Sequence, residues 1–246
     1  MMMRILYFIT ACFLMVSGTL HAEESSPPGI TFHVLRLIYP EAAAQGVTLT
    51  AGNTTPDAYL IQSRIRPVDE KTGDLDFNYQ SHTAMPFVIT PPLSRLEGNS
   101  ELTVRIRRND VSLPTDRESV FFVSMRAMPS QHPTPEQGKM VMTVVSNLKL
   151  FYRPEGLSKR AVADMAPRLR FHREGSQLIA SNPTPYWLTF SRLAVGNALL
   201  SNAELRLMVP PFGQQAYAMP PDRRGEVTWQ LIDEDGWNTP VSKQPL

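Results

Sequence analysis

Two cations of this 246-residue chain have apolar neighbours, and their residue types suit the binding of an anion. Arg36 lies within the run Val34–Ile38, and Lys149 lies between Leu148 and Leu150. Taken singly, each is ordinarily a rim charge that reaches water along its own stem. If the strands that carry them run side by side, however, the cations approach each other and need an anion. A chain-terminal carboxylate fits, because arginine offers a bidentate fork and lysine a point charge.

Residue patterns for catalysis or metal binding are missing. No two glycines are separated by a single residue, which excludes phosphate and dinucleotide loops and the nucleophile elbow. The histidines form no zinc-binding spacing; they are His21, His33, His82, His132 and His172. We therefore predict no enzymatic activity, no catalytic residue, no cofactor and no metal. A hydrolase with a scattered triad is a further hypothesis, which an activity screen would test.

Two polar clusters have an ordinary explanation as turns. Asp233-Glu234-Asp235 invites a calcium or acid–base interpretation, but a solvated turn before Gly236-Trp237 is favoured. Asn53-Thr54-Thr55 matches a glycosylation acceptor, and turn chemistry explains it as well.

The first 22 residues are predicted to be a cleavable signal peptide. Arg4 supplies the positive charge, an apolar run follows from Ile5 to Val16, and Ala22 is a small residue suited to cleavage. The run is shorter than the roughly 18–20 residues that span a bilayer. Removal of Arg4 brings the 24 basic residues into balance with the 23 acidic ones. This balance does not resemble the excess of basic residues that a nucleic-acid-binding protein has. Cys12 is the one cysteine and leaves with the signal, so core packing alone must hold the exported chain.

One unusually long strand is predicted over residues 139–152. Apolar residues alternate through Met140, Met142, Val144 and Leu148, and Pro154 ends the run. Typical strands have about 5–6 residues. A long apolar strand that is partly unpaired is an aggregation hazard, so a chain that keeps one is expected to use it for adding to another protein's sheet. Counting by twos from Met140 reaches Leu148, so Lys149 is expected to need a bulge or twist to share that face.

The other strand candidates are short and separated by Pro-rich turns, which is an all-β pattern. A short helical turn is expected at Leu157–Ala166, and the pattern resets near residue 155. We predict a signal at 1–22, an N-terminal sandwich at 23–155 and a smaller C-terminal sandwich at 156–246. The predicted strands are Thr31–Ile38, Gly46–Ala51, Tyr59–Ile65, Pro86–Thr90, Leu102–Arg107, Val120–Met125 and Lys139–Tyr152, then Arg168–His172, Gln177–Ser181, Tyr186–Leu193, Ala203–Met208, Gln214–Ala218 and Val227–Ile232.

Five segments together resemble the periplasmic chaperones of the chaperone–usher pathway, which assemble pili and fimbriae. They follow one another over nearly all of the chain beyond the signal: RLIYP at 36–40, PFVITPPLSR at 86–95, LPTDRESVF at 113–121, NLKLFYRP at 147–154 and SNPTPYWLT at 181–189. The resemblance implies two immunoglobulin-like β-sandwich domains set at an angle, with a cleft between them.

The resemblance also implies residue roles. Arg36 and Lys149 match the cations that hold the C-terminal carboxylate of a pilus subunit. Met140, Met142 and Val144 match the donor-strand residues that fill the subunit's open groove. Glu118 and Arg153 match two members of an interdomain ionic network, whose third member falls within Asp233-Glu234-Asp235 and aligns best with Glu234.

The implied function is a chaperone in the periplasm, not embedded in the membrane, with pilus or fimbrial subunits and an outer-membrane usher as partners. Self-association through the donor strand is a further possibility that the sequence leaves open. The alternative is an adhesion or structural β-sandwich module without chaperone action, which does not explain two cations beside a long apolar strand.

Overall fold

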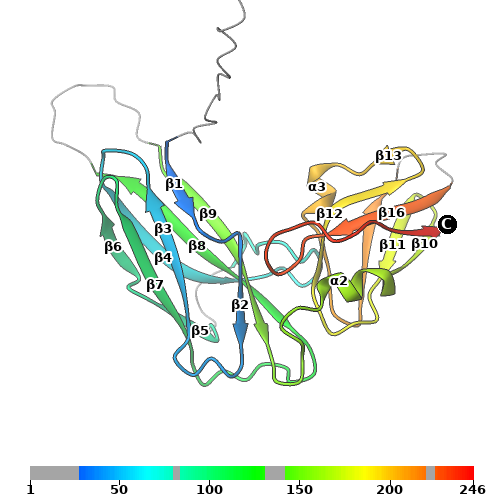
Figure 1. The fold of residues 1–246 in the computed structure, drawn as a ribbon, viewed down its shortest axis with the longest axis horizontal. Helices are drawn as coiled ribbons and strands as arrows, with labels where there is room; N and C mark the ends of the chain where they lie inside the picture. Colours follow the sequence, from blue (N-terminus) through cyan, green and yellow to red (C-terminus); the bar gives the residue numbers. More distant parts are fainter. Residues whose placement is uncertain (1–27, 80–83, 131–141, 220–224) are drawn as a thin grey trace, which may run out of the picture.

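The computed structural model describes residues 28–79, 84–130, 142–219 and 225–246, and these are mainly strands. Figure 1 shows two lobes that meet near the middle of the molecule. Each lobe contains two β-sheets with its own buried cluster between them. The predicted all-β fold of two sandwiches is therefore confirmed. The predicted signal peptide at 1–22, Met140, His82 and His132 lie outside the described residues.

The first lobe is a sandwich of a four-stranded and a five-stranded sheet. The four-stranded sheet has the order β1-β3-β7-β5, with bounds Ile30–Phe32, Val47–Asn53, Glu101–Arg108 and Phe87–Thr90. The five-stranded sheet has the order β2-β9-β8-β4-β6, with bounds Arg36–Pro40, Val144–Arg153, Ser119–Pro129, Tyr59–Pro67 and Leu93–Leu96. Strand β6 was not predicted from the sequence.

The chain changes sheets between β1 and β2, so the prediction of one strand over Thr31–Ile38 is wrong. Strand β1 pairs antiparallel with β3, whereas β2 pairs parallel with β9 in the opposite sheet. Figure 1 shows the bend between the two strands. An apolar pattern marks which residues are buried, but it does not say which of two facing sheets buries them. This change of sheet places Arg36 beside β9.

Alternate side chains of strand β9 lie in two different environments. Leu148, Leu150 and Tyr152 lie in the core of the first lobe. On the other face, Phe151 forms a smaller cluster with Met208 of the second lobe. Because successive side chains of a strand point to opposite faces, Lys149 and Arg153 share this face with Phe151, and both also contact the second lobe. The strand begins at Val144, so the predicted start at 139 is not confirmed: residues 142 and 143 precede it, and 139–141 are not described.

The second lobe packs a three-stranded sheet against a five-stranded one. The smaller sheet has the order β10-β11-β15, with bounds Arg170–Glu174, Gln177–Ser181 and Gln214–Ala218. The larger has the order β13-β12-β16-β17, and β14 also pairs with β12; the bounds are Ala198–Leu199, Leu188–Val195, Glu226–Leu231, Ser242–Pro245 and Met208–Val209. Strands β13 and β17 were not predicted.

Short helices lie at two places in this lobe. The predicted helical turn is confirmed as α2, Val162–Met165, which continues into a 3₁₀ turn at Ala166–Arg168. The prediction of a strand over Ala203–Met208 is wrong, because helix α3 spans Asn202–Leu205. The Ser201 side chain accepts a hydrogen bond from the Glu204 amide at the helix start, an N-cap that favours helix over strand.

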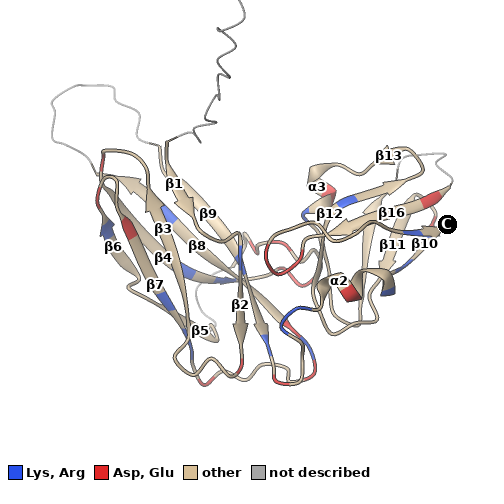
Figure 2. Cartoon of the chain, in the orientation of Figure 1, with Lys and Arg blue, Asp and Glu red and all other residues tan. Residues whose placement is uncertain are grey.

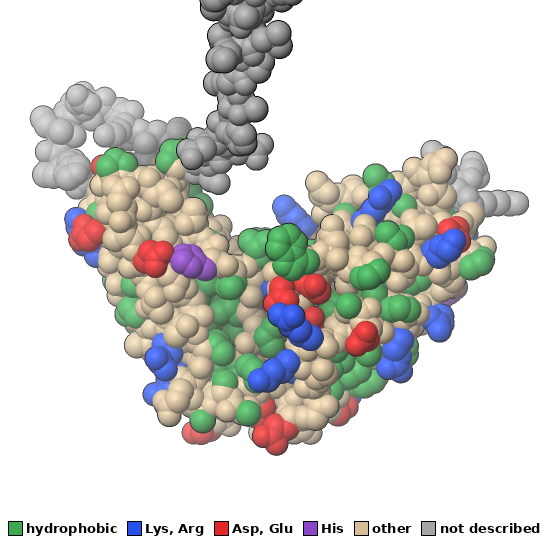
Figure 3. Space-filling model, in the orientation of Figure 1, with side chains coloured by type: hydrophobic (Ala, Val, Ile, Leu, Met, Phe, Trp, Pro, Cys, Tyr) green, Lys and Arg blue, Asp and Glu red, His purple; other side chains and the backbone are tan. Residues whose placement is uncertain are grey.

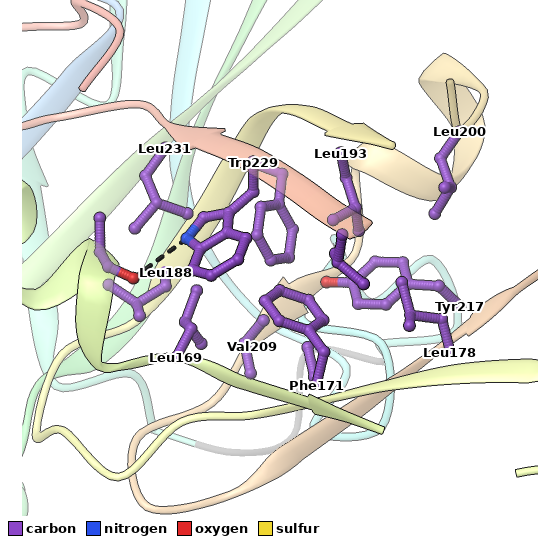
Figure 4. Packing of buried hydrophobic residues seen from close by; sticks show 14 of the residues in the cluster. Leu169, Phe171, Leu178, Leu188, Leu193, Leu200, Val209, Tyr217, Trp229 and Leu231 are labelled. Carbon is purple, nitrogen blue, oxygen red and sulfur yellow. Dashed lines mark hydrogen bonds between the residues drawn. The ribbon is translucent and has the colours of Figure 1, made fainter. Parts of the chain in front are cut away.

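Aromatic residues fill the second core. Figure 4 shows Trp229 packed between Leu231, Leu188 and Phe171. The indole Nε1 of Trp229 donates a hydrogen bond of 3.0 Å to the backbone oxygen of Ala166, which fastens the short helical segment to the sheet. A buried indole N–H needs such a partner, because leaving it unpaired costs free energy.

None of the helices in the part of the chain that the structure describes is long and apolar enough to cross a membrane.

Candidate anion site and strand edge

The two predicted cations are direct neighbours. Arg36 of β2 is the register partner of Lys149 of β9 in a parallel ladder. The condition under which the two cations approach each other, that their strands run side by side, is therefore met. Neighbouring strands lie about 4.8 Å apart, so the two side chains leave adjacent backbones on the same face. Figure 2 shows blue segments on neighbouring strands of the first lobe close to its junction with the second.

No bulge brings Lys149 to the face of Val144, so that expectation is wrong. The pairing of β8 with β9 is regular from Ser119↔Tyr152 to Ala127↔Val144. Met142 and Val144 therefore share the parity of the core residues, and Lys149 points to the opposite face, toward the second lobe. The cation and the apolar residues use different sides of one strand.

The guanidinium of Arg36 is held between the lobes. Its Nη1 donates a hydrogen bond of 2.8 Å to the backbone oxygen of Ile232, and its Cζ lies 5.2 Å from the centroid of the Phe151 ring. Burial lowers the pKa of Arg36 to about 10, and nearby carboxylates, first that of Glu118, oppose this shift. The group stays charged at neutral pH and has donors left for a carboxylate, because a guanidinium carries five N–H groups.

The Lys149 ammonium is less well compensated. Its Nζ lies 3.5 Å from Oγ1 of Thr189 in the second lobe. Burial, and next the charge of Arg36, lower the pKa of Lys149 to about 8, while the Asp74 carboxylate acts in the opposite direction. Because the charge of Arg36 disfavours the charged form of Lys149, a negatively charged guest between the two side chains would relieve the repulsion.

The edge of β9 is open beside this site. Residues 144–148 pair with β8 on one side, and β2 pairs with β9 only from Lys149 to Arg153 on the other. Within the described residues no strand pairs with the second side of Val144–Leu148. Unpaired backbone N–H and C=O groups of this kind are a template for another chain. The apolar side chains there are also exposed: Met142 by 72%, Val144 by 53% and Val145 by 46%.

Three residues link the two lobes in a buried ionic network. Arg153 Nη2 lies 2.6 Å from Glu118 Oε1, and its Nη1 lies 3.1 Å from Glu234 Oε1. Burial raises the pKa of Glu118, and Arg153 opposes that shift. The acidic turn is thus not wholly solvated, because the Glu234 carboxylate reaches across the interface, while the exposed Asp235 pairs with Arg160.

Sequence reasoning missed several further contacts that set the position of the lobes. The amide of Trp187 donates to Glu118 Oε2 at 2.9 Å, and the Arg153 guanidinium lies 5.0 Å from the centroid of the Tyr186 ring. The amide of Met208 donates to the backbone oxygen of Thr72, at 3.2 Å. Backbone oxygens and amides form many of the contacts in this interface, and such contacts cannot be predicted from a pattern of side chains in the sequence.

The structure also bears on the glycosylation and calcium interpretations of the two polar clusters. The Asn53 side chain is buried and donates to the backbone oxygens of Asp57 and Glu97, so it serves the turn and is not presented at the surface. No group of three or more His, Cys, Asp or Glu residues in the described part of the chain could hold a metal ion.

Comparisons with known proteins match both lobes. Residues 29–158 match the model of the pili and flagellar-assembly chaperone family, PapD N-terminal domain, and residues 164–243 match the pili assembly chaperone PapD, C-terminal domain. The chaperone protein FimC of Escherichia coli K12 is 33% identical over 229 residues, which cover 92% of this chain and 86% of FimC.

Solved structures agree with the family models. A chain of the Salmonella enterica SafA pilin–SafB chaperone complex superposes with a TM-score of 0.77 and 26% identity, covering 90% of this chain and 98% of that one. The Escherichia coli chaperone DraB gives 0.73 and 30%, covering 89% and 99%. With both lobes matched in order and most of each relative covered, the chain belongs to the PapD family of pilus-assembly chaperones.

Proposed function

We propose that this protein captures pilus or fimbrial subunits in the periplasm by lending them β9 and its preceding residues as a donor strand. The subunit's C-terminal carboxylate binds between Arg36 and Lys149. Met140, Met142 and Val144 fill the subunit's open groove, and the protein then delivers the subunit to an outer-membrane usher. Residues 1–22 direct export, and residues 23–155 and 156–246 form the two domains.

The observation that carries this proposal is the open edge of β9 that ends at the cation pair. Strand β2 starts at Arg36 and runs parallel to β9. A guest strand on the open edge occupies the place that β2 leaves vacant before Arg36. If it also runs parallel, its C-terminal end arrives at Arg36 and Lys149. The carboxylate then fixes the register, because a slip of one residue would turn the guest's other face inward.

The donor side chains supply the apolar part of binding. Met142 and Val144 have the same parity in sequence, and both are exposed in the unbound protein. Burying each in a subunit groove contributes about 1.5–3 kcal/mol before the cost of ordering. Methionine adds adaptability, because its unbranched thioether adjusts to irregular cavities. The same open edge could pair with a second copy of the chain, so the free protein is a candidate for self-association.

Co-purification of subunits from periplasm tests the proposal. We expect Arg36→Ala and Lys149→Ala to abolish capture while both proteins stay folded, since each change removes a carboxylate ligand but no core side chain. Arg160→Ala is the matched control, because Arg160 is a cation near the same interface whose side chain is 78% exposed. Normal yields of subunit with both cleft variants would refute the proposed anchor.

A further inference from the structure

Two exposed apolar side chains lie where the lobes meet, next to the cation pair. Leu35 is 77% exposed and Trp237 is 73% exposed, and they come from different lobes. Leu35 directly precedes Arg36, and its Cδ1 would lie 3.8 Å from a Cβ placed on Gly236, the neighbour of Trp237. Figure 3 shows hydrophobic and acidic side chains grouped at this junction. We refer to Leu35 and Trp237 as the apolar rim.

The loop that presents Trp237 is firmly held, so its exposure is a fixed property of the fold. The Asp233 amide donates to the Trp237 backbone oxygen at 2.8 Å, and the Trp237 amide donates to Asp233 Oδ1 at 2.8 Å. Glu234 of the same loop binds Arg153. Gly236 has a φ of 90°, a conformation that suits glycine. Because the backbone that carries the indole is already ordered, binding has to order only the side chain of Trp237 and not the loop.

The apolar rim is continuous with the proposed subunit site. Arg36 Nη1 binds the backbone oxygen of Ile232, which is bridged to Asn238 at the base of the same loop. An extended chain rises about 3.3 Å per residue, so a carboxylate on Arg36 brings the guest's last residues beside Leu35. The last two side chains of a guest point to opposite faces, and one of them then lies toward the rim.

We propose that the apolar rim is a specificity site for the end of the subunit. It favours guests with a large apolar or aromatic side chain within their last two residues. This inference rests on the proposed function, because it requires the guest's carboxylate to lie at Arg36 and Lys149. The cations recognise the terminal carboxylate, and Leu35 and Trp237 recognise the side chains of the last two residues.

A matched set of peptides tests this inference on the purified full chain. Each labelled peptide has about 12 residues of alternating valine and threonine, enough to cover the open edge. The last two residues are both phenylalanine or both serine, and each version has a free carboxylate or an amide end. We expect fluorescence anisotropy to show about tenfold tighter binding of the phenylalanine-ended acid than of the serine-ended acid.

Variants of the rim separate its role from folding. Trp237→Ala and Leu35→Ser should each reduce the preference to about threefold or less and leave affinity for the serine-ended acid unchanged. Leu199→Ser is the control, because Leu199 is 59% exposed and lies in β13 of the second lobe, away from the junction in Figure 1. A preference that survives in both rim variants, or is missing from the unaltered protein, would overturn the inference.

Tryptophan emission gives a direct readout. Of the three tryptophans in the chain, Trp229 is buried and Trp187 is partly buried, so Trp237 is the exposed reporter. Binding of the phenylalanine-ended acid should shift emission to shorter wavelength, and Trp237→Phe should bind equally well without the shift.

The remaining outcomes distinguish the two proposals. Equal binding of acid and amide peptides would overturn the carboxylate anchor and the rim with it. If binding still requires a free carboxylate but does not depend on whether the last two residues are phenylalanine or serine, the proposal for the rim alone is overturned. A rim variant that alters the oligomeric state instead of peptide binding would assign the surface to a second copy of the chain and also overturn the inference.

Discussion

At the scale of single residues, we expect the charge of Lys149 to couple binding of the proposed guest to pH. The ammonium is surrounded by Arg36 on the neighbouring strand, the Asp74 carboxylate and the hydroxyl of Thr189. Its pKa of about 8 lies within reach of ordinary buffers, whereas Arg36, with a pKa of about 10, stays charged there. Below pH 8 the unbound lysine is mostly charged, and above it mostly neutral.

The pH profile of binding follows from this pKa. A bound carboxylate raises the pKa of Lys149, so binding takes up a proton above pH 8, and affinity should fall as pH rises. Between pH 7 and pH 9 we expect the dissociation constant of an acid-ended peptide to rise about tenfold. Lys149→Arg should flatten the profile, because its guanidinium keeps the charge. A flat profile in the unaltered protein would show that the ammonium form of Lys149 is not required.

At the scale of elements, β9 divides its tasks between two faces. Even-numbered residues continue from the core of the first lobe to Val144 and Met142, the proposed donor positions, and the odd-numbered Lys149 and Phe151 face the second lobe. The division predicts opposite results for neighbouring substitutions. Met142→Glu should weaken subunit stability in the periplasm, because it places a charge in the groove and forgoes about 1.5–3 kcal/mol of burial.

Thr143→Glu is the matched change one residue further on, and it should leave the subunit's lifetime nearly unchanged because its side chain leaves the opposite face. Both lifetimes are followed by immunoblotting of periplasmic fractions over time. Equal loss with the two variants would mean that the segment around residue 142 does not bind with strand alternation.

Strands with local signals were predictable from the sequence. Gln177–Ser181 and Gln214–Ala218 were predicted with the bounds that the structure has, because turn residues delimit each apolar alternation. The change of sheet between β1 and β2 was not predictable, since it depends on which sheet lies nearer. Helix α3 does carry a local signal, because Ser201 three residues before Glu204 is a capping-box spacing.

The candidate site was predictable in composition but not in geometry. Arg36 and Lys149 stood out as cations among apolar residues, and the ladder places them in register. Their pairing with backbone groups such as the Ile232 oxygen was not predictable, because such partners have no sequence signature. The bulge expected at Lys149 assumed that anchor and donor residues share a face. The regular register places Lys149 and Val144 on opposite faces of β9.

At the scale of the whole molecule, a buried ion pair and an apolar cluster hold the lobes together. The side chains of Arg153 and Glu118 are 3% and 1% exposed, and that of Glu234 is 8% exposed. Met208 of the second lobe packs with Val120 and Phe151 of the first. Because Arg36 and Lys149 both contact the second lobe, the interface also sets the geometry of the cation pair.

Arg153→Met should therefore be strongly destabilising. It leaves the Glu118 and Glu234 carboxylates buried without their cation, and removal of one partner of a buried pair costs about 3–5 kcal/mol. Arg160→Met removes the cation of an exposed pair with Asp235 and should cost about 0–1 kcal/mol. Urea denaturation of the two variants gives both values, and equal midpoints would mean that the buried network contributes no more than a surface contact.

If guests bind as proposed, the placement of the cation and the donor positions on one strand fixes the distance between a guest's terminus and the gap that the strand fills. Lys149 and Val144 are five residues apart on β9, whose pairing with β8 is regular throughout. The span between a guest's terminus and its missing strand is thus measured in whole residues. A subunit shortened by one residue would still offer a carboxylate, but its vacancy would be out of step. Such a subunit would bind less tightly, so the chaperone would select subunits of the correct length before assembly.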